Sequence, residues 1–383
     1  MKTIKFNTIW SLAFVIWFTS EFTFSHSFFN VLGIALFVGV SLLYLVKGKI
    51  CIKPILILYI LFIIICFINI ITGHSISTAN SYAYLWTLIK NLFFLISLCQ
   101  FIYVIKIENV KNLFVVSSVM ASAFLLLLTF FMTNSFFIRS DNSLTNANYL
   151  AVCDAFALVL LIAGKKITKW KQSEVLMAVV LVLFCVLSGT RKSLLAVAIG
   201  IIIYFLARYP KRIIRYIIIF SLVAVISYFA LMKITFLYEF MGYRIESLFA
   251  FMSGTGGDAS VRLRSWLIDL GIQEFKKSPI IGHGLNCFKT LPGTLDTYSH
   301  NNYVELLFSV GIIGTTIYYL MHITVFFSAL KEYMKNRTSN LCLCLAYVVV
   351  LMIMDYAMVS YYERGNILYI ALFSFMLYEE QTK

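Results

Sequence analysis

Apolar runs of membrane length recur along the whole chain and are separated by short polar connections. A helix that crosses a bilayer needs about 20 predominantly apolar residues, and about twelve runs approach that length. They occupy residues 8–24, 28–46, 54–72, 82–105, 112–132, 149–164, 174–190, 193–208, 213–236, 301–330, 340–360 and 366–379. The pattern predicts an all-α polytopic membrane protein with about twelve transmembrane helices, forming a single integral membrane domain over residues 1–383.

The composition agrees with this prediction and excludes a water-soluble enzyme, a disordered chain and a secreted disulfide scaffold. Hydrophobic residues make up 61% of the chain and charged residues 13%, whereas a soluble domain is about one quarter charged. The net charge of +14 comes from basic clusters between the apolar runs, so it does not indicate nucleic-acid binding. The eight cysteines form no C-x-x-C pair, which argues against a disulfide framework and a zinc site.

The basic clusters fall in every second connection, as the positive-inside rule requires of cytoplasmic loops. We therefore predict that both termini are cytoplasmic and that the first span is a retained signal anchor. The clusters are Lys47, Lys49 and Lys53; Lys106 and Lys111; Lys165, Lys166, Lys169 and Lys171; Arg208, Lys211, Arg212 and Arg215; and Lys331, Lys335 and Arg337.

Two connections on the predicted external side are unusually long, a small loop at 133–148 and a large one at 237–300. Long loops in compact proteins are usually functional. Within the large loop, Ser260 to Lys277 has apolar residues at helical spacing, bounded by glycines at 254–257 and by Pro279. This spacing predicts an amphipathic helix on the outer membrane face.

The strongest candidate for chemistry lies where the large loop re-enters the membrane, at Ser299-His300-Asn301-Asn302 followed by Glu305. Histidine is the side chain that can act as a base near neutral pH. The asparagines can bind sugar hydroxyls, and an ionisable group inside a span indicates function. The alternative is a polar N-cap without any chemical role.

Arg191 and Lys192 lie in a tight hairpin on the side where basic residues should be scarce. A guanidinium there can bind a phosphate with two parallel hydrogen bonds. The alternative is that both cations snorkel at a helix end.

Further external cations are candidates for substrate binding. Arg262 and Arg264 belong to the amphipathic segment and could instead grip anionic lipid. Arg139, followed by Asn146 and Asn148, and Arg364 could be ordinary solvated loop charges.

The order of these elements resembles the O-antigen ligase/polymerase superfamily of bacterial membrane glycosyltransferases. The resemblance covers residues 139 to 314, and it rests on segments that follow in the same order. These are the loop from Arg139 to Asn148, Ser188-Gly189-Thr190-Arg191, Arg262 with Trp266, Pro279-Ile280-Ile281-Gly282-His283-Gly284, and His300 to Gly314 with its His-Asn-x-Tyr-x-Glu and Gly-x-x-Gly patterns.

The resemblance implies a fold similar to the lipid-sugar-dependent GT-C transferases in the bacterial inner membrane, with an external active face. The donor would be an oligosaccharide on undecaprenyl pyrophosphate, and neither a nucleotide sugar nor an obligatory metal would be needed. Arg191, Arg262 and Arg139 would bind the pyrophosphate, which gains charge as the glycosidic bond breaks. His300 would be the base of an inverting transfer, oriented by Glu305. His283 is a second external histidine, but only His300 lies in the His-Asn segment.

We expect a polymerase that joins lipid-linked repeat units of a surface polysaccharide, working beside membrane lipid, chain-length regulators and flippases. The alternative within the same family is the ligase that transfers finished glycan to lipid A–core. A transporter or flippase is the alternative from another class, but the sequence has no internal repeat and no clear helix interruption, which such proteins often show. A scaffold without activity is the third alternative.

Overall fold

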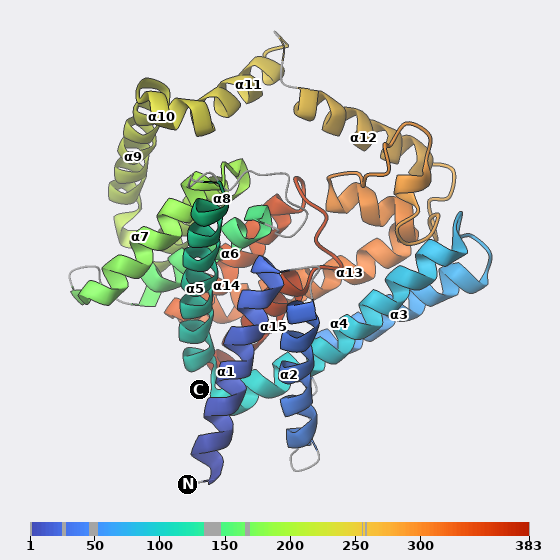
Figure 1. The fold of residues 1–383 in the computed structure, drawn as a ribbon, viewed down its shortest axis with the longest axis horizontal. Helices are drawn as coiled ribbons and strands as arrows, with labels where there is room; N and C mark the ends of the chain where they lie inside the picture. The colour runs from blue at the N-terminus through green and yellow to red at the C-terminus, as the bar shows by residue number, and fades with distance from the viewer. Residues whose placement is uncertain are drawn as a thin grey trace.

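The chain forms helices and no strand over the part that the computed structural model describes, which is residues 2–24, 28–45, 53–133, 147–164, 169–254, 256 and 259–382. Each predicted apolar run coincides with one helix (Figure 1). Twelve helices correspond to the runs: α1 (Lys2–Thr23), α2 (Phe28–Leu45), α3 (Pro54–Ile71), α4 (Thr78–Ile105), α5 (Ile107–Thr133), α6 (Ala147–Gly164), α7 (Gln172–Leu187), α8 (Arg191–Arg208), α9 (Ile213–Lys233), α13 (Asn302–Lys335), α14 (Ser339–Met354) and α15 (Arg364–Gln381). Arg139 and Asn146 lie outside the described residues.

Six of the described helices are long and apolar enough to cross a membrane, namely α3, α4, α5, α6, α9 and α13. α2, α7 and α14 are apolar but shorter. The prediction of a multi-pass membrane protein is therefore confirmed. The count of about twelve spans and the orientation of the termini stay predictions.

Helices α6, α14 and α15 occupy the middle of the bundle, since two thirds or more of their residues are buried. Aromatic rings fill the space between them: Phe156 lies 4.3 Å from Tyr369 and 4.8 Å from Tyr347 between ring centroids. A helix that is apolar on every side can be buried in this way without exposing a polar stripe.

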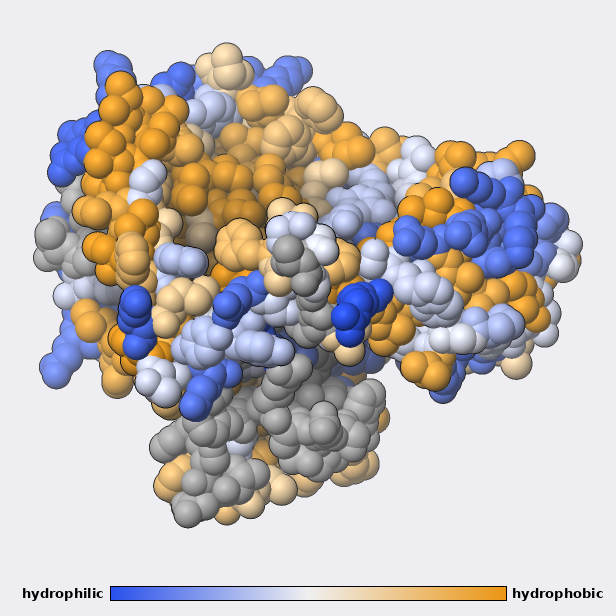
Figure 2. All heavy atoms as spheres, turned by 90° about the horizontal axis from the view of Figure 1, so that it is seen from above, coloured by the Kyte–Doolittle hydropathy of each residue, from blue (hydrophilic) through white to orange (hydrophobic). Residues whose placement is uncertain are grey.

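Helix α9 shows the opposite behaviour, because none of its residues is buried. It leads through the short α10 (Thr235–Leu237) and a π-helical turn, Tyr238–Gly242, into α11 (Tyr243–Met252) and α12 (Ala259–Phe275). In Figure 1 these helices form an arch that stands away from the bundle. Seen from the side of the arch, the surface is hollowed, and the recess is largely hydrophobic with hydrophilic residues along its margin (Figure 2). An all-apolar helix needs no protein partner where lipid surrounds it.

The predicted amphipathic helix is present as α12, but its apolar side packs on protein. Leu267 forms a small core with Cys287, Phe288 and Phe308. Gly271 lies directly against Val304 of α13, so a larger side chain would not fit there. This docking against α13 fixes α12 relative to the start of that helix, and its location on the outer membrane face stays a prediction.

Helix α13 is interrupted at Gly311, whose φ of 63° and ψ of −168° are not helical. The segment 279–284 replaces the lost hydrogen bonds: the His283 and Gly284 amides donate to the Phe308 and Ser309 carbonyls at 2.8 and 2.9 Å. In return the Ile312 amide donates to the Pro279 carbonyl at 2.8 Å. The sequence-based expectation of no clear interruption is thus wrong, because a Gly in an apolar run does not reveal that a distant segment will pair with it.

Glycine is required at this contact between segment 279–284 and α13. A Cβ atom on Gly282 would lie 2.6 Å from the backbone of Gly311, and both residues have positive φ. Two backbones can approach so closely only without side chains. The Pro-Ile-Ile-Gly-His-Gly and Gly-x-x-Gly patterns noted in the sequence are therefore two halves of one contact.

Candidate active site at one end of the bundle

His300 stands at the start of α13 between two neighbours that are fixed by hydrogen bonds. Ser299 and Asn301 are buried, whereas the His300 ring is only partly buried. The Asn301 side chain caps the helix by accepting from the Val304 amide at 3.1 Å. His300 itself has a φ of 58°, which a non-glycine residue adopts only when its surroundings impose it.

Glu305 holds this turn rather than the histidine ring. Its buried carboxylate accepts a hydrogen bond from the Ser299 amide at 2.9 Å. The Ser299 hydroxyl in turn donates to the Asn301 carbonyl at 2.8 Å. Glu305 therefore determines the backbone on which His300 is carried, so it can orient His300 through this turn.

Asn302 is anchored to the connection between α14 and α15. Its amide group donates to the Asp355 carboxylate at 2.9 Å and to Tyr319 at 3.0 Å, while its carbonyl oxygen accepts from the Ser360 and Tyr361 amides. The buried side chain has no exposed polar atom left for a sugar. Both asparagines thus serve the fold, as the alternative N-cap interpretation of this segment anticipated for Asn301.

Asp355 is a residue whose role the sequence left open. Its carboxylate also accepts from Tyr319 at 2.9 Å and from Ser360 at 2.5 Å, and its backbone carbonyl accepts from the Asn302 amide at 2.7 Å. The only signal in the sequence is an acidic residue at the end of an apolar run, which is costly unless it is satisfied. Its partners are up to 53 residues away.

Two cations face the His300 ring. Burial, followed by the positive charges of Arg264 and Lys192, lowers the pKa of His300 to about 4. The imidazole is therefore neutral at pH 7, and neither nitrogen forms a hydrogen bond with another described residue. The ring also contacts Tyr298, with 4.3 Å between centroids.

Lys192 and Arg264 come from two different helices, the first turn of α8 and the middle of α12. Both side chains are partly buried. Neither forms a hydrogen bond or an ion pair with another described residue. Two cations held near each other without an acidic partner form a site suited to an anion.

Arg191 stabilises the wall of this site. Its guanidinium donates to the Arg244 carbonyl of α11 at 2.8 Å, and Arg244 donates back to the Gly189 carbonyl at 2.6 Å. Thr190 in the same hairpin donates to Asn148 of α6 at 2.7 Å. The hairpin between α7 and α8 is thereby tied to the arch and to the bundle.

Arg262 lies on the exposed side of α12, two residues before Arg264. Positions two apart on a helix point in nearly opposite directions. Only one of the two arginines can therefore face His300, and the structure places Arg264 there.

Two other sequence candidates are engaged elsewhere. His283 contacts the Glu274 carbonyl through Nε2 at 2.8 Å and stacks on Phe308. Arg364 pairs with both carboxylate oxygens of Glu21 at 2.9 and 2.8 Å. His283 therefore supports the loop, and Arg364 joins α15 to α1.

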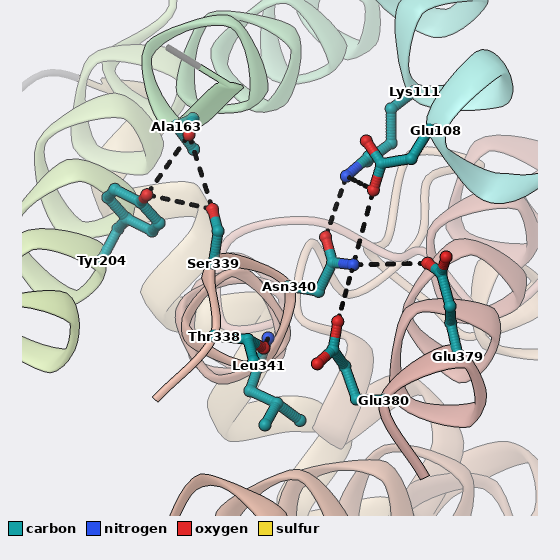
Figure 3. A network of polar contacts seen from close by, with 10 residues as sticks. All are labelled: Glu108, Lys111, Ala163, Tyr204, Thr338, Ser339, Asn340, Leu341, Glu379 and Glu380. Carbon is teal, nitrogen blue, oxygen red and sulfur yellow. Dashed lines mark hydrogen bonds and ion pairs between the residues drawn. The ribbon is translucent and has the colours of Figure 1, made fainter. Parts of the chain in front are cut away.

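The opposite end of the bundle, predicted to be cytoplasmic, carries a different polar network (Figure 3). Lys111 donates to Glu108 at 2.6 Å and to Asn340 at 2.8 Å. The Asn340 amide group lies 3.4 Å from Glu379 and 3.1 Å from Glu380. This network joins α5, α14 and α15 at an end where the lysine is paired.

Comparison with known proteins agrees with the motifs that surround the candidate site. Residues 176–319 match a protein family described as O-antigen ligase. This stretch contains Lys192, Arg264 and His300 as well as both halves of the glycine contact at α13. No curated protein matches the chain. The resemblance to the O-antigen ligase/polymerase superfamily is thus confirmed over residues 176–319 of this multi-pass membrane protein.

Proposed function

We propose that this chain is an inverting glycosyltransferase that polymerises oligosaccharide repeat units carried on undecaprenyl pyrophosphate. The observation that carries the proposal is the convergence, at one end of a membrane bundle, of a neutral histidine and two cations that have no hydrogen-bond or ion-pair partner among the described residues. A pyrophosphate fits the cations, and a lipid carrier fits the membrane location.

The proposed reaction needs one proton acceptor and one anion site. His300 takes the proton of the acceptor hydroxyl as that oxygen attacks the anomeric carbon of the donor. The bond from the anomeric carbon to the phosphate oxygen breaks, and its electron pair leaves on the pyrophosphate. Lys192 and Arg264 stabilise the added negative charge, which is the largest contribution that such a site can make.

The remaining candidates receive supporting roles in this proposal. Arg191 keeps the hairpin and Lys192 in place, and Glu305 fixes the turn that carries His300. Arg264 rather than Arg262 faces the reacting atoms, while the exposed Arg262 meets the donor as it arrives. Arg139, which lies outside the described residues, is assigned the same role by the family resemblance. The external location of this end, and cooperation with chain-length regulators and flippases, belong to the same proposal.

Substitution of His300 and Arg191 tests this function directly. We expect His300→Ala to reduce polymer by about 10²–10⁴-fold while the protein stays in the membrane, and Arg191→Ala to abolish the glycan ladder as well. Lys289→Ala is a matched control on the same loop, since among the described residues this lysine pairs with exposed Asp296 alone, at 3.8 Å. A normal ladder in either of the first two variants would contradict the mechanism.

The ligase is the second candidate, favoured by the description of the matching family. Deletion of the gene separates the two reactions. Loss of a polymerase leaves single repeat units on the final acceptor, whereas loss of a ligase leaves finished polymer on the lipid carrier. Separation of the glycans by size and by anchor distinguishes these outcomes.

A further inference from the structure

Three side chains from outside the cationic side of the site lie near Tyr298, the neighbour of His300. Tyr84 belongs to α4, and Tyr362 and Glu363 belong to the connection between α14 and α15. We refer to Tyr84, Tyr298 and Tyr362 as the aromatic cluster. Except for Tyr298, all of these residues lie outside the stretch that matches the O-antigen ligase family.

The aromatic cluster is held at its base and open at its surface. The Tyr84 and Tyr362 rings meet edge to face with 5.3 Å between centroids. The Tyr362 carbonyl accepts a hydrogen bond from buried Asn91 at 2.7 Å, which fixes the backbone. Tyr298 is 41% exposed although its ring touches His300, so one ring face is accessible beside the proposed base.

The charges on the two sides of His300 have opposite signs. Arg264 and Lys192 act on His300, and Arg264 also acts on Tyr298, whereas the carboxyl of Glu363 acts on Tyr298, Tyr84 and Tyr362. Burial and the nearby Glu21 raise the pKa of Glu363 to about 7. Glu363 can therefore both donate and accept hydrogen bonds near neutral pH, and its remaining negative charge repels a pyrophosphate.

We propose that the aromatic cluster and Glu363 form the subsite for the acceptor sugar of the transfer reaction, an inference that rests on the proposed function. Attack from the side opposite the leaving group requires the acceptor hydroxyl to approach His300 away from the cations. A pyranose presents C–H groups on its faces, which pack on aromatic rings, and hydroxyls on its rim, which bond to carboxyl and phenol groups. The negative charge of Glu363 keeps the two substrates in their separate subsites.

The test compares transfer with hydrolysis of the same donor. Full-length protein in lipid nanodiscs is incubated with lipid-linked oligosaccharide extracted from cells that lack this chain, and both polymer and free oligosaccharide are measured. Hydrolysis to water needs the cations and His300 but no acceptor subsite. We expect Tyr298→Leu and Tyr84→Leu to lower the ratio of transfer to hydrolysis about tenfold or more. Tyr298→Phe should keep the ratio within about threefold, because the ring face remains.

Glu363→Gln sharpens the test because glutamine keeps hydrogen-bonding groups but cannot be charged. We expect a higher KM for the repeat unit and a loss of the pH dependence that Glu363 adds to KM. Tyr356→Leu is the matched control, a 65% exposed tyrosine on the same connection, and it should leave the ratio unchanged.

The results separate the subsite from the function on which it rests. If Tyr298→Leu loses transfer and hydrolysis equally, the ring only supports His300 and the subsite proposal is wrong. If the unaltered protein neither transfers nor hydrolyses the donor, the proposed function itself fails. An unchanged ratio of transfer to hydrolysis in Tyr84→Leu and Glu363→Gln would also refute the subsite proposal.

Discussion

Lys111 at one end of the bundle and the pair Lys192 and Arg264 at the other end have different surroundings. At the predicted cytoplasmic end, Lys111 is satisfied by Glu108 and Asn340 at 2.6 and 2.8 Å. At the other end, Lys192 and Arg264 are partly buried near each other without an acidic partner among the described residues. Arg364 at this second end is paired with Glu21, so Lys192 and Arg264, which have no such partner among the described residues, are the cations available to a ligand.

The largest expected effect is a loss of transfer activity, without a loss of stability, on substitution of Arg264. Arg264→Ala should lower transfer by about 100-fold, because it removes one of two charges that face the leaving group. The melting temperature should stay the same or rise, since a mutual repulsion between cations is removed. Transfer assays and thermal unfolding of the purified protein check both halves. A variant that unfolds earlier would show that Arg264 is a structural cation like Lys111.

Asp355→Ala should damage the fold and the site together. The substitution leaves Asn302, Tyr319 and Ser360 without their shared acceptor, and unsatisfied buried groups cost about 1–3 kcal/mol each. We expect less protein in the membrane, an earlier melting transition and weak activity in what remains. Asp355→Asn, which keeps the shape and one acceptor, should recover part of the stability. Full stability of Asp355→Ala would contradict the anchoring role.

The pH dependence should report the charges around His300. Because burial and the two cations lower its pKa to about 4, the imidazole can accept a proton over the whole neutral range. kcat/KM should rise with pH through that low value and fall again above pH 7, because burial and the nearby Arg264 lower the pKa of Lys192 to about 7 and its charge is then lost. A bound pyrophosphate offsets the cations, so the midpoint for kcat should lie at higher pH than that for kcat/KM. Arg264→Gln should move the kcat/KM midpoint upward.

The lowered pKa of His300 also makes the stability of the folded protein depend on pH. The unfolded chain binds a proton to this histidine near pH 6.5, and the folded chain binds it only near pH 4. Between these values the unfolded state holds more protons, so stability contributed by His300 is present above pH 6.5 and is lost as pH falls toward 4. His300→Gln should flatten this part of the stability profile, as measured by unfolding at several pH values.

The smallest effect is expected from substitution of Lys111, at the predicted cytoplasmic end of the bundle. Lys111→Met removes an ion pair with exposed Glu108 and one hydrogen bond to Asn340. We expect a loss of about 1 kcal/mol of stability and normal transfer activity. A strong loss of activity would break the division between the two ends. Measurement of the melting temperature and of glycan length in the same preparation decides the matter.

The helices could be predicted because each depends on its own residues. An apolar run of sufficient length forms a helix in a membrane whatever its neighbours are, and each of the predicted runs contains one. The break in α13 could not be predicted, because it depends on a segment about 30 residues earlier that exchanges hydrogen bonds with Gly311 and its neighbours. The motif letters of both segments were visible, but their pairing was not.

The sequence predicted which types of residue form the candidate site, but it did not fully predict which of them lie close together. The sequence identified cations and a histidine that could share one end of the molecule, and the structure brings Lys192, Arg264 and His300 together. It could not choose between Arg262 and Arg264, because that choice depends on how α12 is rotated against α13. Nor could it find Tyr84 or Glu363, which reach the site from helices far away in the sequence.

The exchange of hydrogen bonds at Gly311 also has a consequence for biogenesis. Backbone groups that are left open in an apolar helix would be expensive to insert into lipid. Residues 279–284 are synthesised before α13, so the strip of chain that covers the open groups is already available when the ribosome delivers that helix. If the gene were rearranged so that residues 279–284 followed α13, the translocation machinery would have to insert a helix with unpaired backbone groups. Quality control would then remove much of the product.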